Sequence, residues 1–166
     1  MRLFIAIDLD DTIRSALTAM QESMRRQNVH GNYTKPENLH LTLAFIGEYG
    51  DPEAVLEALA SVPLQPFSLT LRGFGSFGNL YWAGLEDSGA LSAYVKRLRH
   101  ALAERDIPFD RKKFSPHITL LRQASEGLPR LRVPEAAMEV RRVSLMCSDR
   151  GKNGMIYTEL GGADGA

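Results

Sequence analysis

The chain has 166 residues, 44% of them hydrophobic, and its 20 basic and 20 acidic side chains cancel to a formal net charge of zero at pH 7. This length suits one domain, or two small lobes with a shared core, and the composition excludes a fibrous or disordered protein. The balanced charge excludes the strong positive field with which a protein grips a long duplex through many phosphates. A small or terminal anionic substrate is still compatible with it.

The N-terminal half predicts a strand, a helix, a loop and a second strand. Residues 3–7 are a short apolar run typical of a buried strand, and Asp10 or Asp11 caps the following helix, which extends to about Gln27. After a polar loop, residues 40–46 return to an apolar strand pattern.

The middle of the chain predicts further elements of both kinds. A short helix begins at Pro52, strands follow at residues 67–71 and 80–85, and a long helix extends to about Arg105 before an apolar strand begins at His117. The glycine pattern of residues 73–78 matches a dinucleotide-binding motif letter for letter, but a strand follows it instead of a helix. We therefore interpret it as a bend between strands and expect no nucleotide cofactor.

Near the C-terminus, residues 140–148 and 155–160 are strand-like and flank Gly-Lys-Asn-Gly at 151–154, which indicates a β-hairpin. Residues 161–166 are expected to be a flexible tail with nothing to bury. Strands outnumber helices and follow one another in an order that antiparallel pairing allows. The predicted fold class is therefore α+β.

Cysteine and apolar content indicate the compartment. Cys147 is the single cysteine, which excludes an intrachain disulfide and a multi-cysteine zinc site. Residues 3–7 are too short for a signal core, and no window approaches the ~20 apolar residues of a membrane span. We expect a cytoplasmic protein without a membrane partner.

The most informative feature is a repeated phrase, His40-Leu41-Thr42-Leu43 and His117-Ile118-Thr119-Leu120, whose copies are 77 residues apart. In each copy the imidazole and the hydroxyl are two positions apart and so project from the same face of a strand. The same shift aligns residues 3–6 with 80–83, and the helical apolar stripes are offset by 78. We predict an internal duplication, roughly residues 3–46 and 80–122, within one bilobal domain of residues 1–166 whose two imidazoles share a cleft.

Two imidazoles in one cleft suit displacement at phosphorus. An imidazole titrates near ~6.5, so one ring can take a proton from a nucleophile while the other gives one to a leaving oxygen. Thr42 and Thr119 can donate hydrogen bonds to non-bridging phosphate oxygens. A metal site is the main rival, but neither motif has Asp, Glu or Cys at ligand spacing, and two histidines alone make a poor cage. We expect no metal.

The two motifs and their flanks resemble the two-histidine (2H) phosphoesterases, in the branch of bacterial RNA 2′,3′-cyclic phosphodiesterases historically called 2′-5′ RNA ligases. The resemblance extends over residues 2–7, 36–48 and 115–122. It implies two pseudo-symmetric lobes of antiparallel sheet with outer helices and a groove between them. It also implies hydrolysis of RNA 2′,3′-cyclic phosphate ends to a 2′-phosphate, and we assign His40 as the general acid and His117 as the general base.

The resemblance implies a phosphate contact for Arg122. Strand parity places Arg122 on the face opposite His117 unless the strand ends or bulges near Leu121, so a solvated surface role is the alternative. Phe4 and Tyr81, equivalent under the 77-residue shift, could stack a nucleobase, and core packing is the alternative for at least one of them.

Partners and rival functions follow from the same resemblance. The expected substrates are tRNA-derived or other small RNAs, and the expected state is a monomer. Tyr33 stands where the family often has Trp, which leaves substrate contacts by that loop open. The rivals are reversible 2′-5′ ligation, with a ribose hydroxyl in place of water, and a non-catalytic nucleotide- or RNA-binding module. The intact His and Thr of both motifs argue against a module that only binds.

Overall fold

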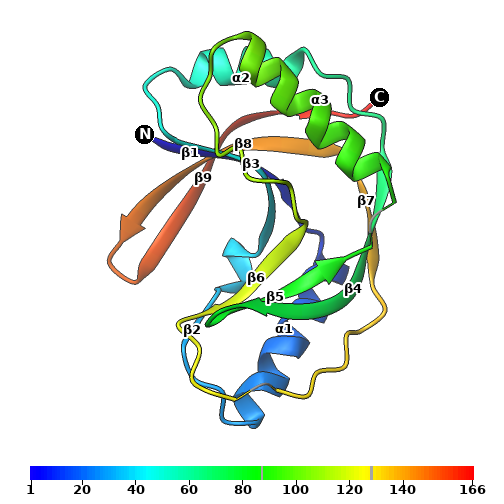
Figure 1. Cartoon of the computed structure of the whole chain (residues 1–166), viewed down its shortest axis with the longest axis vertical. Coiled ribbons are helices and arrows are strands. Elements are labelled where there is room, and N and C mark those ends of the chain that lie inside the picture. Colours follow the sequence, from blue (N-terminus) through cyan, green and yellow to red (C-terminus); the bar gives the residue numbers. More distant parts are fainter. Residues whose placement is uncertain (87, 128) are drawn as a thin grey trace.

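The computed structural model describes residues 1–86, 88–127 and 129–166, which form two antiparallel sheets flanked by three α-helices (Figure 1). The strands are β1 Arg2–Asp8, β2 Asn32–Tyr33, β3 His40–Glu48, β4 Phe67–Phe77, β5 Leu80–Leu85, β6 His117–Arg122, β7 Ala137–Val140, β8 Arg142–Gly151 and β9 Gly154–Asp164. The helices are α1 Asp11–Arg26, α2 Pro52–Ala60, α3 Ala90–Glu104 and the 3-10 turn η1 Pro36–Asn38. The predicted α+β class is confirmed.

The two sheets give the motif strands the same setting. One sheet has the order β3-β1-β8-β9 and the other β2-β6-β5-β4-β7. The first motif strand, β3, pairs with β1, and the second, β6, pairs with β5. In both cases the partner is the strand before the intervening long helix. An internal duplication would produce this arrangement, and the duplication stays a prediction.

The two long helices pack across the halves of the chain. Helix α1 follows β1 of the four-stranded sheet but contacts β6 and β7 of the other lobe. Helix α3 follows β5 of the five-stranded sheet but contacts β3 and α2, as well as β4. Figure 1 shows α1 beside the five-stranded sheet, and α2 and α3 together over the four-stranded one. Each half of the chain therefore covers part of the other.

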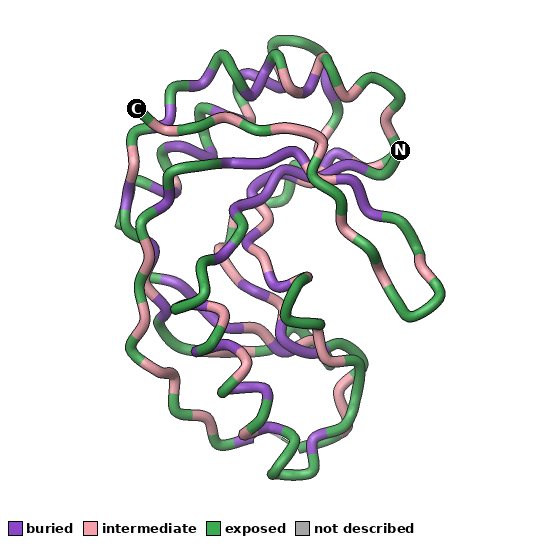
Figure 2. Tube along the Cα trace, turned by 180° about the vertical axis from the view of Figure 1, so that it is seen from behind, coloured by how far each residue is buried: buried purple, intermediate pink, exposed green. Residues whose placement is uncertain are grey.

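The long helices α1 and α3 bury their apolar stripes, as the sequence predicts. Asp10 caps α1 by accepting a hydrogen bond from the Ile13 amide at 3.0 Å, and the apolar side of the helix is buried. Figure 2 shows the buried residues gathered in the central strands, while the tip of the β8–β9 hairpin is exposed. No helix within the described ranges is long and apolar enough to cross a membrane.

Strand β3 carries two extra residues relative to β1, Leu43 and Ile46, and the one at Leu43 lies beside the first motif. Ala6 lies opposite Thr42 and Ile5 lies opposite Ala44, so Leu43 has no partner in the register. Burial shows the same irregularity, because both Leu43 and Ala44 are buried although neighbouring residues of a regular strand face opposite sides. This is a β-bulge directly after the first motif.

Strand β6 carries the equivalent bulge. Successive residues of β5 lie opposite Thr119 and Leu121, so Leu120 is the extra residue, and both leucines are buried. One extra residue returns Arg122 to the face of His117. By strand parity, Arg122 faces the cleft only if β6 ends or bulges near Leu121, and the bulge at Leu120 provides this.

The C-terminal segment differs from its prediction. Residues 161–164 belong to β9 and pair with residues 142–145 of β8, so the prediction of a flexible tail beginning at residue 161 is wrong. Asp164 also forms an ion pair with Arg142 at 2.8 Å. Glycines hid this strand, because Gly161 and Gly162 interrupt the side-chain alternation from which a strand is read.

The predicted strand at residues 140–148 is divided between the two sheets. Val140 ends β7 and pairs with Phe67 of the five-stranded sheet, whereas β8 begins at Arg142 in the other sheet. The hairpin itself is confirmed, with Lys152 and Asn153 forming its turn.

Removing residues 161–166 is predicted to lower the free energy of unfolding by about 2–4 kcal/mol, since each lost sheet hydrogen bond contributes ~0.5–1.5 kcal/mol net. Urea denaturation of the full and shortened chains measures the difference. A chain lacking only Ala166 is the control and should lose less than about 1.5 kcal/mol, because it gives up a single backbone hydrogen bond to Leu64. Equal stability of all three chains would restore the tail interpretation.

Candidate active site

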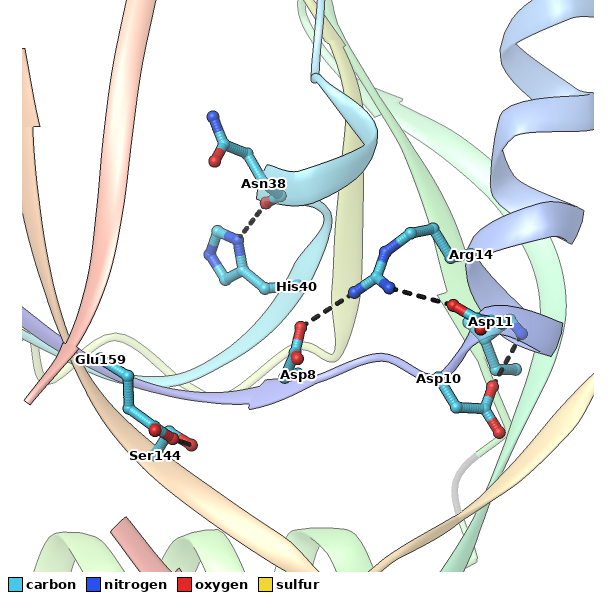
Figure 3. A network of polar contacts seen from close by, with 9 residues as sticks. Asp8, Asp10, Asp11, Arg14, Asn38, His40, Ser144 and Glu159 are labelled. Atoms are coloured by element: carbon cyan, nitrogen blue, oxygen red, sulfur yellow. Dashed lines mark hydrogen bonds and ion pairs between the residues drawn. The ribbon is translucent and has the colours of Figure 1, made fainter. Parts of the chain in front are cut away.

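Both motif histidines are tethered in the same way. The Nδ1 of His40 lies 2.7 Å from the carbonyl oxygen of Asn38, as Figure 3 shows, and the Nδ1 of His117 lies 2.7 Å from that of Ser115. A carbonyl only accepts hydrogen bonds, so Nδ1 carries the hydrogen in each ring. The tether fixes the tautomer and leaves Nε2 as the atom that can exchange protons with a ligand.

The two motifs meet at one small cavity of about 110 Å³. Its lining comprises the two motif histidines, the two motif threonines and four further residues: His40, His117, Thr42, Thr119, Thr34, Asn38, Arg122 and Tyr157. Pockets for whole small molecules usually measure about 300–1,000 Å³, so this one suits a group the size of a phosphate. A nucleoside attached to that phosphate would have to lie outside the cavity.

Larger cavities adjoin this one. One of about 490 Å³ shares Thr42 and His117 with it, and its lining includes three aromatic rings, three cations and one carboxylate: Phe45, Phe77, Phe114, Arg99, Lys112, Lys113 and Asp110. Another of about 560 Å³ shares Arg122 and Tyr157 and includes Arg25, Tyr33 and Lys35. Both combine cations with aromatic rings. The chain therefore concentrates positive charge at the site although its net charge is zero.

A third cavity, of about 260 Å³, also contacts His40 but is acidic. Its Asp8 forms an ion pair with Arg14 at 3.0 Å, and its Glu159 accepts a hydrogen bond from the Ser144 hydroxyl at 2.5 Å (Figure 3). Carboxylates repel a phosphate group. The charges therefore direct an anionic ligand to the cavity that contains both motifs.

Phe4 lies against the His40 ring instead of facing solvent. Its ring centroid is 5.0 Å from that of His40 and 5.1 Å from that of Tyr157, and only 4% of Phe4 is exposed. This burial argues against the expected stacking of a base on Phe4. Its counterpart Tyr81 is also buried, and the Tyr81 hydroxyl donates to the carbonyl of Gly127 at 2.9 Å. Tyr81 belongs to the apolar core, whereas Phe4 also lines the cavity of about 260 Å³ beside His40, and base stacking on Phe4 stays a prediction.

Other aromatic residues surround the histidines, and the sequence did not reveal them. Tyr157 of β9 lies edge-on to His40 at 5.2 Å, and Phe77 of β4 lies edge-on to His117 at 5.2 Å. Phe77 is 49% exposed, which is unusual for such a large apolar side chain, and Trp82 packs beside it. Phe77 therefore has the open face that Phe4 lacks. No local sequence signal distinguishes an exposed aromatic residue from a buried one.

Thr42 and Thr119 differ in the absence of a ligand. The hydroxyl of Thr42 lies 2.8 Å from Nε2 of His40 and donates to it, because Nδ1 already carries the ring hydrogen. Thr119 lines the same cavity beside His117. A phosphate binding at Thr42 would therefore have to compete with this hydrogen bond.

The pKa of His40 lies below its ordinary value. Burial is the main cause, since it disfavours the charged ring; the Asn38 carbonyl acts in the opposite direction, and Arg122 lowers the pKa further. Asp8 raises it and His117 lowers it, both more weakly. In the free protein at neutral pH, His40 is therefore held in the neutral, proton-accepting form.

The described part of the chain contains no group of three or more His, Cys, Asp or Glu residues arranged to hold a metal ion.

Replacing Arg122 with Ala is predicted to raise the pKa of His40, because the substitution removes a positive charge that disfavours the imidazolium. Asp8→Asn is the matched opposite change and should lower it. NMR titration of the imidazole Cε1 proton measures both shifts, with the exposed His100 as the internal reference. A His40 titration that ignores both substitutions would contradict the proximity of these groups.

Known proteins with this architecture share its sequence features. The LigT like phosphoesterase family matches residues 7–82 and 84–157. The RNA 2′,3′-cyclic phosphodiesterase of Archaeoglobus fulgidus is 33% identical over 152 residues, covering 87% of this chain and 81% of that protein. The Escherichia coli K12 protein of the same name is 36% identical over 132 residues, covering 76% and 74%.

Solved structures agree with the sequence matches. Apo E. coli LigT superposes with a TM-score of 0.84 at 29% identity and covers 98% of this chain and 96% of its own. The MHV ns2 PDE domain, at 11% identity and a TM-score of 0.62, shares the fold. With a family match over most of its length and both His-x-Thr motifs at one cavity, the chain belongs to the LigT-like, two-histidine phosphoesterase family.

Proposed function

We propose that this protein hydrolyses RNA ends that carry a 2′,3′-cyclic phosphate, without a metal or a nucleotide cofactor, and releases a 2′-phosphate. One observation carries the proposal: two imidazoles, both tethered through Nδ1, line a single phosphate-sized cavity. The names of the relatives support the substrate. E. coli LigT has been solved in complex with phosphate and with 3′-AMP, which supports a phosphate-bearing nucleotide as the ligand.

In the proposed reaction, water attacks phosphorus opposite the leaving oxygen. The Nε2 of one histidine takes a proton from the water as the new P–O bond forms. The Nε2 of the other gives a proton to the ribose 3′ oxygen as the P–O3′ bond breaks. One ring gains a proton and the other loses one, so the total number of protons on the two rings is unchanged, and proton exchange with solvent restores the starting state. Thr42, Thr119 and Arg122 bind the non-bridging oxygens and stabilise the charge that develops there.

We assign His40 as the acid and His117 as the base. The low pKa of His40 in the free protein works against this assignment, because an acid must be protonated before it acts. A bound phosphodiester anion offsets the charge of Arg122 and raises the pKa of His40, which supplies the protonated form. The roles therefore depend on the substrate-bound site.

Ligation to a 2′-5′ linkage is the second candidate. A ribose hydroxyl then replaces water, and the reaction needs a nucleoside on each side of the phosphate. The cavities of about 490 and 560 Å³ that adjoin the motif cavity offer two such places, both lined by aromatic and basic residues. Joining of oligonucleotide ends by the purified protein would support this candidate.

The extent of the site bears on partners. The motif cavity has room for one phosphate, and the other two cavities lie directly beside it. A site of this extent suits the ends of small RNAs, including tRNA-derived ones, better than long duplexes. We propose such ends as substrates and a monomer of the cytoplasm as the working state. Gel filtration with light scattering measures the mass against 18.4 kDa for one chain.

With EDTA present, the protein is predicted to open a short oligonucleotide 2′,3′-cyclic phosphate to a 2′-phosphate. Phosphorus NMR distinguishes this product from the 3′-phosphate. A 3′-phosphate would reverse the proposed orientation of the ribose and leave the paired histidines in place. Loss of activity in EDTA, restored by a divalent cation, would contradict the metal-free mechanism.

His40→Ala and His117→Ala are each predicted to lower kcat by about 10²–10⁴-fold, the usual contribution of a general acid or base. The two rings act in one displacement, so the double variant should lose much less than the product of the single losses. His100→Ala, on the exposed side of α3, is the control and should retain full activity. Multiplicative losses would contradict a shared site.

A substrate with sulfur in place of the 3′ oxygen separates the two roles. A thiolate leaves without a proton, so this substrate should restore most of the rate of His40→Ala and little of that of His117→Ala. The reverse pattern would exchange the acid and the base.

A further inference from the structure

A buried amide on α1 holds the bulge of β6. Gln21 is 2% exposed, and its Nε2 donates to the carbonyl of Leu120 at 3.0 Å and to that of Thr34 at 2.8 Å. Leu120 is the extra residue of β6, and its carbonyl also accepts from the amide of Thr34 at 3.0 Å. Gln21 therefore joins the bulge to the segment that lies beside it.

A guanidinium on α3 holds the bulge of β3 in the same way. Arg99 donates from Nη2 to the carbonyl of Leu43 at 3.2 Å, with Nε at 3.4 Å, and from Nη1 to that of Lys112 at 2.7 Å. Leu43 is the extra residue of β3 that follows the first His-x-Thr motif. Each contact has its counterpart in the Gln21 set.

The two sets are related by the shift that relates the motifs. Arg99 follows Gln21 by 78 residues, as Lys112 follows Thr34, and the bulge residues are 77 apart. The offset of 78 is also that of the helical apolar stripes. An amide and a guanidinium, which are dissimilar side chains, thus bind equivalent carbonyls, and each reaches from the helix of one half to the motif strand of the other.

We infer that Gln21 and Arg99 are positioning residues for the reaction, each fixing the bulge that follows one His-x-Thr motif. A bulge takes carbonyls out of the regular sheet pairing, and a buried carbonyl needs a donor. When Gln21 is removed, the Leu120 carbonyl keeps the Thr34 amide but loses the side-chain donor that restrains it from α1. The bulge can then move by one residue, which turns the following side chain to the other face. On β6 that side chain is Arg122, so Gln21 acts through Arg122. The inference rests on the proposed function.

The test compares Gln21→Met and Arg99→Met, which keep side-chain length and remove the donors. Gln27→Met is the control at the C-cap of the first helix, because the Gln27 side chain bonds to Ser23 and to the Arg130 backbone. The exposed Arg97 gives the control Arg97→Met on the second helix. Melting temperatures show that each variant is folded at the assay temperature.

Both positioning variants should lower kcat about 10- to 100-fold, the effect of displacing a group in the site by roughly 1 Å, while the controls keep the wild-type rate. In an Arg122→Ala background, Gln21→Met should cost less than two-fold, since its effect passes through Arg122. Arg99→Met should keep its full effect there. Arg99→Lys, which retains a donor, should restore part of the rate.

Equal losses from Gln21→Met with and without Arg122 would overturn the inference, as would wild-type rates in both positioning variants. If Gln21→Met does not fold, Arg99→Met and Arg99→Lys test the inference, because Arg99 is only half-buried. Equal losses of kcat in these two variants would overturn it. Inorganic phosphate provides a readout without turnover. Phosphate should shift the NMR signal of the Arg122 guanidinium in the wild type and not in Gln21→Met. If the wild type shows this shift but hydrolyses no cyclic phosphate, the proposed function is overturned and the positioning role of Gln21 is not.

Discussion

The site depends on the antiparallel pairing of each motif strand with the strand before its long helix, and on the extra residue that follows each His-x-Thr motif. A regular strand would place His and Thr on one face and the residue five positions after the histidine on the other. With the bulges at Leu43 and Leu120, both motifs retain a polar face, and Arg122 joins that of His117. Buried leucines on the opposite face fix each strand against its lobe. Apolar packing thus decides where the polar groups point.

Charge at the site is arranged locally. A chain with no net charge provides two basic cavities beside the motifs and an acidic one behind His40. Two of the three carboxylates of the acidic cavity are engaged, Asp8 with Arg14 and Glu159 with Ser144, and all three repel an anion. An anion that enters the site meets imidazole, hydroxyl and guanidinium groups in turn. Whole-chain charge reports none of this, because it averages over faces that the fold separates.

Much of this could be predicted from the sequence, and the failures have definite causes. The repeated His-x-Thr phrase and the helical stripes are periodic signals, and they gave the fold class, the helices and the shared cavity. Arg122 could not be placed, because one extra residue in a strand leaves no local mark on the sequence. Residues 161–164 were misjudged because glycine erases alternation. Phe77 and Tyr157 lie beside the histidines because their strands pair over long sequence separations, and the burial of Phe4 depends on the same long-range packing.

The crossed packing of the helices has a consequence for folding and for descent. A half of the chain on its own would expose the strand that the other half's helix covers, and would leave a bulge carbonyl without its donor. The two lobes are therefore expected to fold in one cooperative transition and not as separate units. If the predicted duplication occurred, a single-repeat ancestor would have needed a second copy of itself, with the helices exchanged across a twofold axis, before gene fusion made the exchange intramolecular. The mismatch between Gln21 and Arg99 would then record how far two once-identical contacts have diverged.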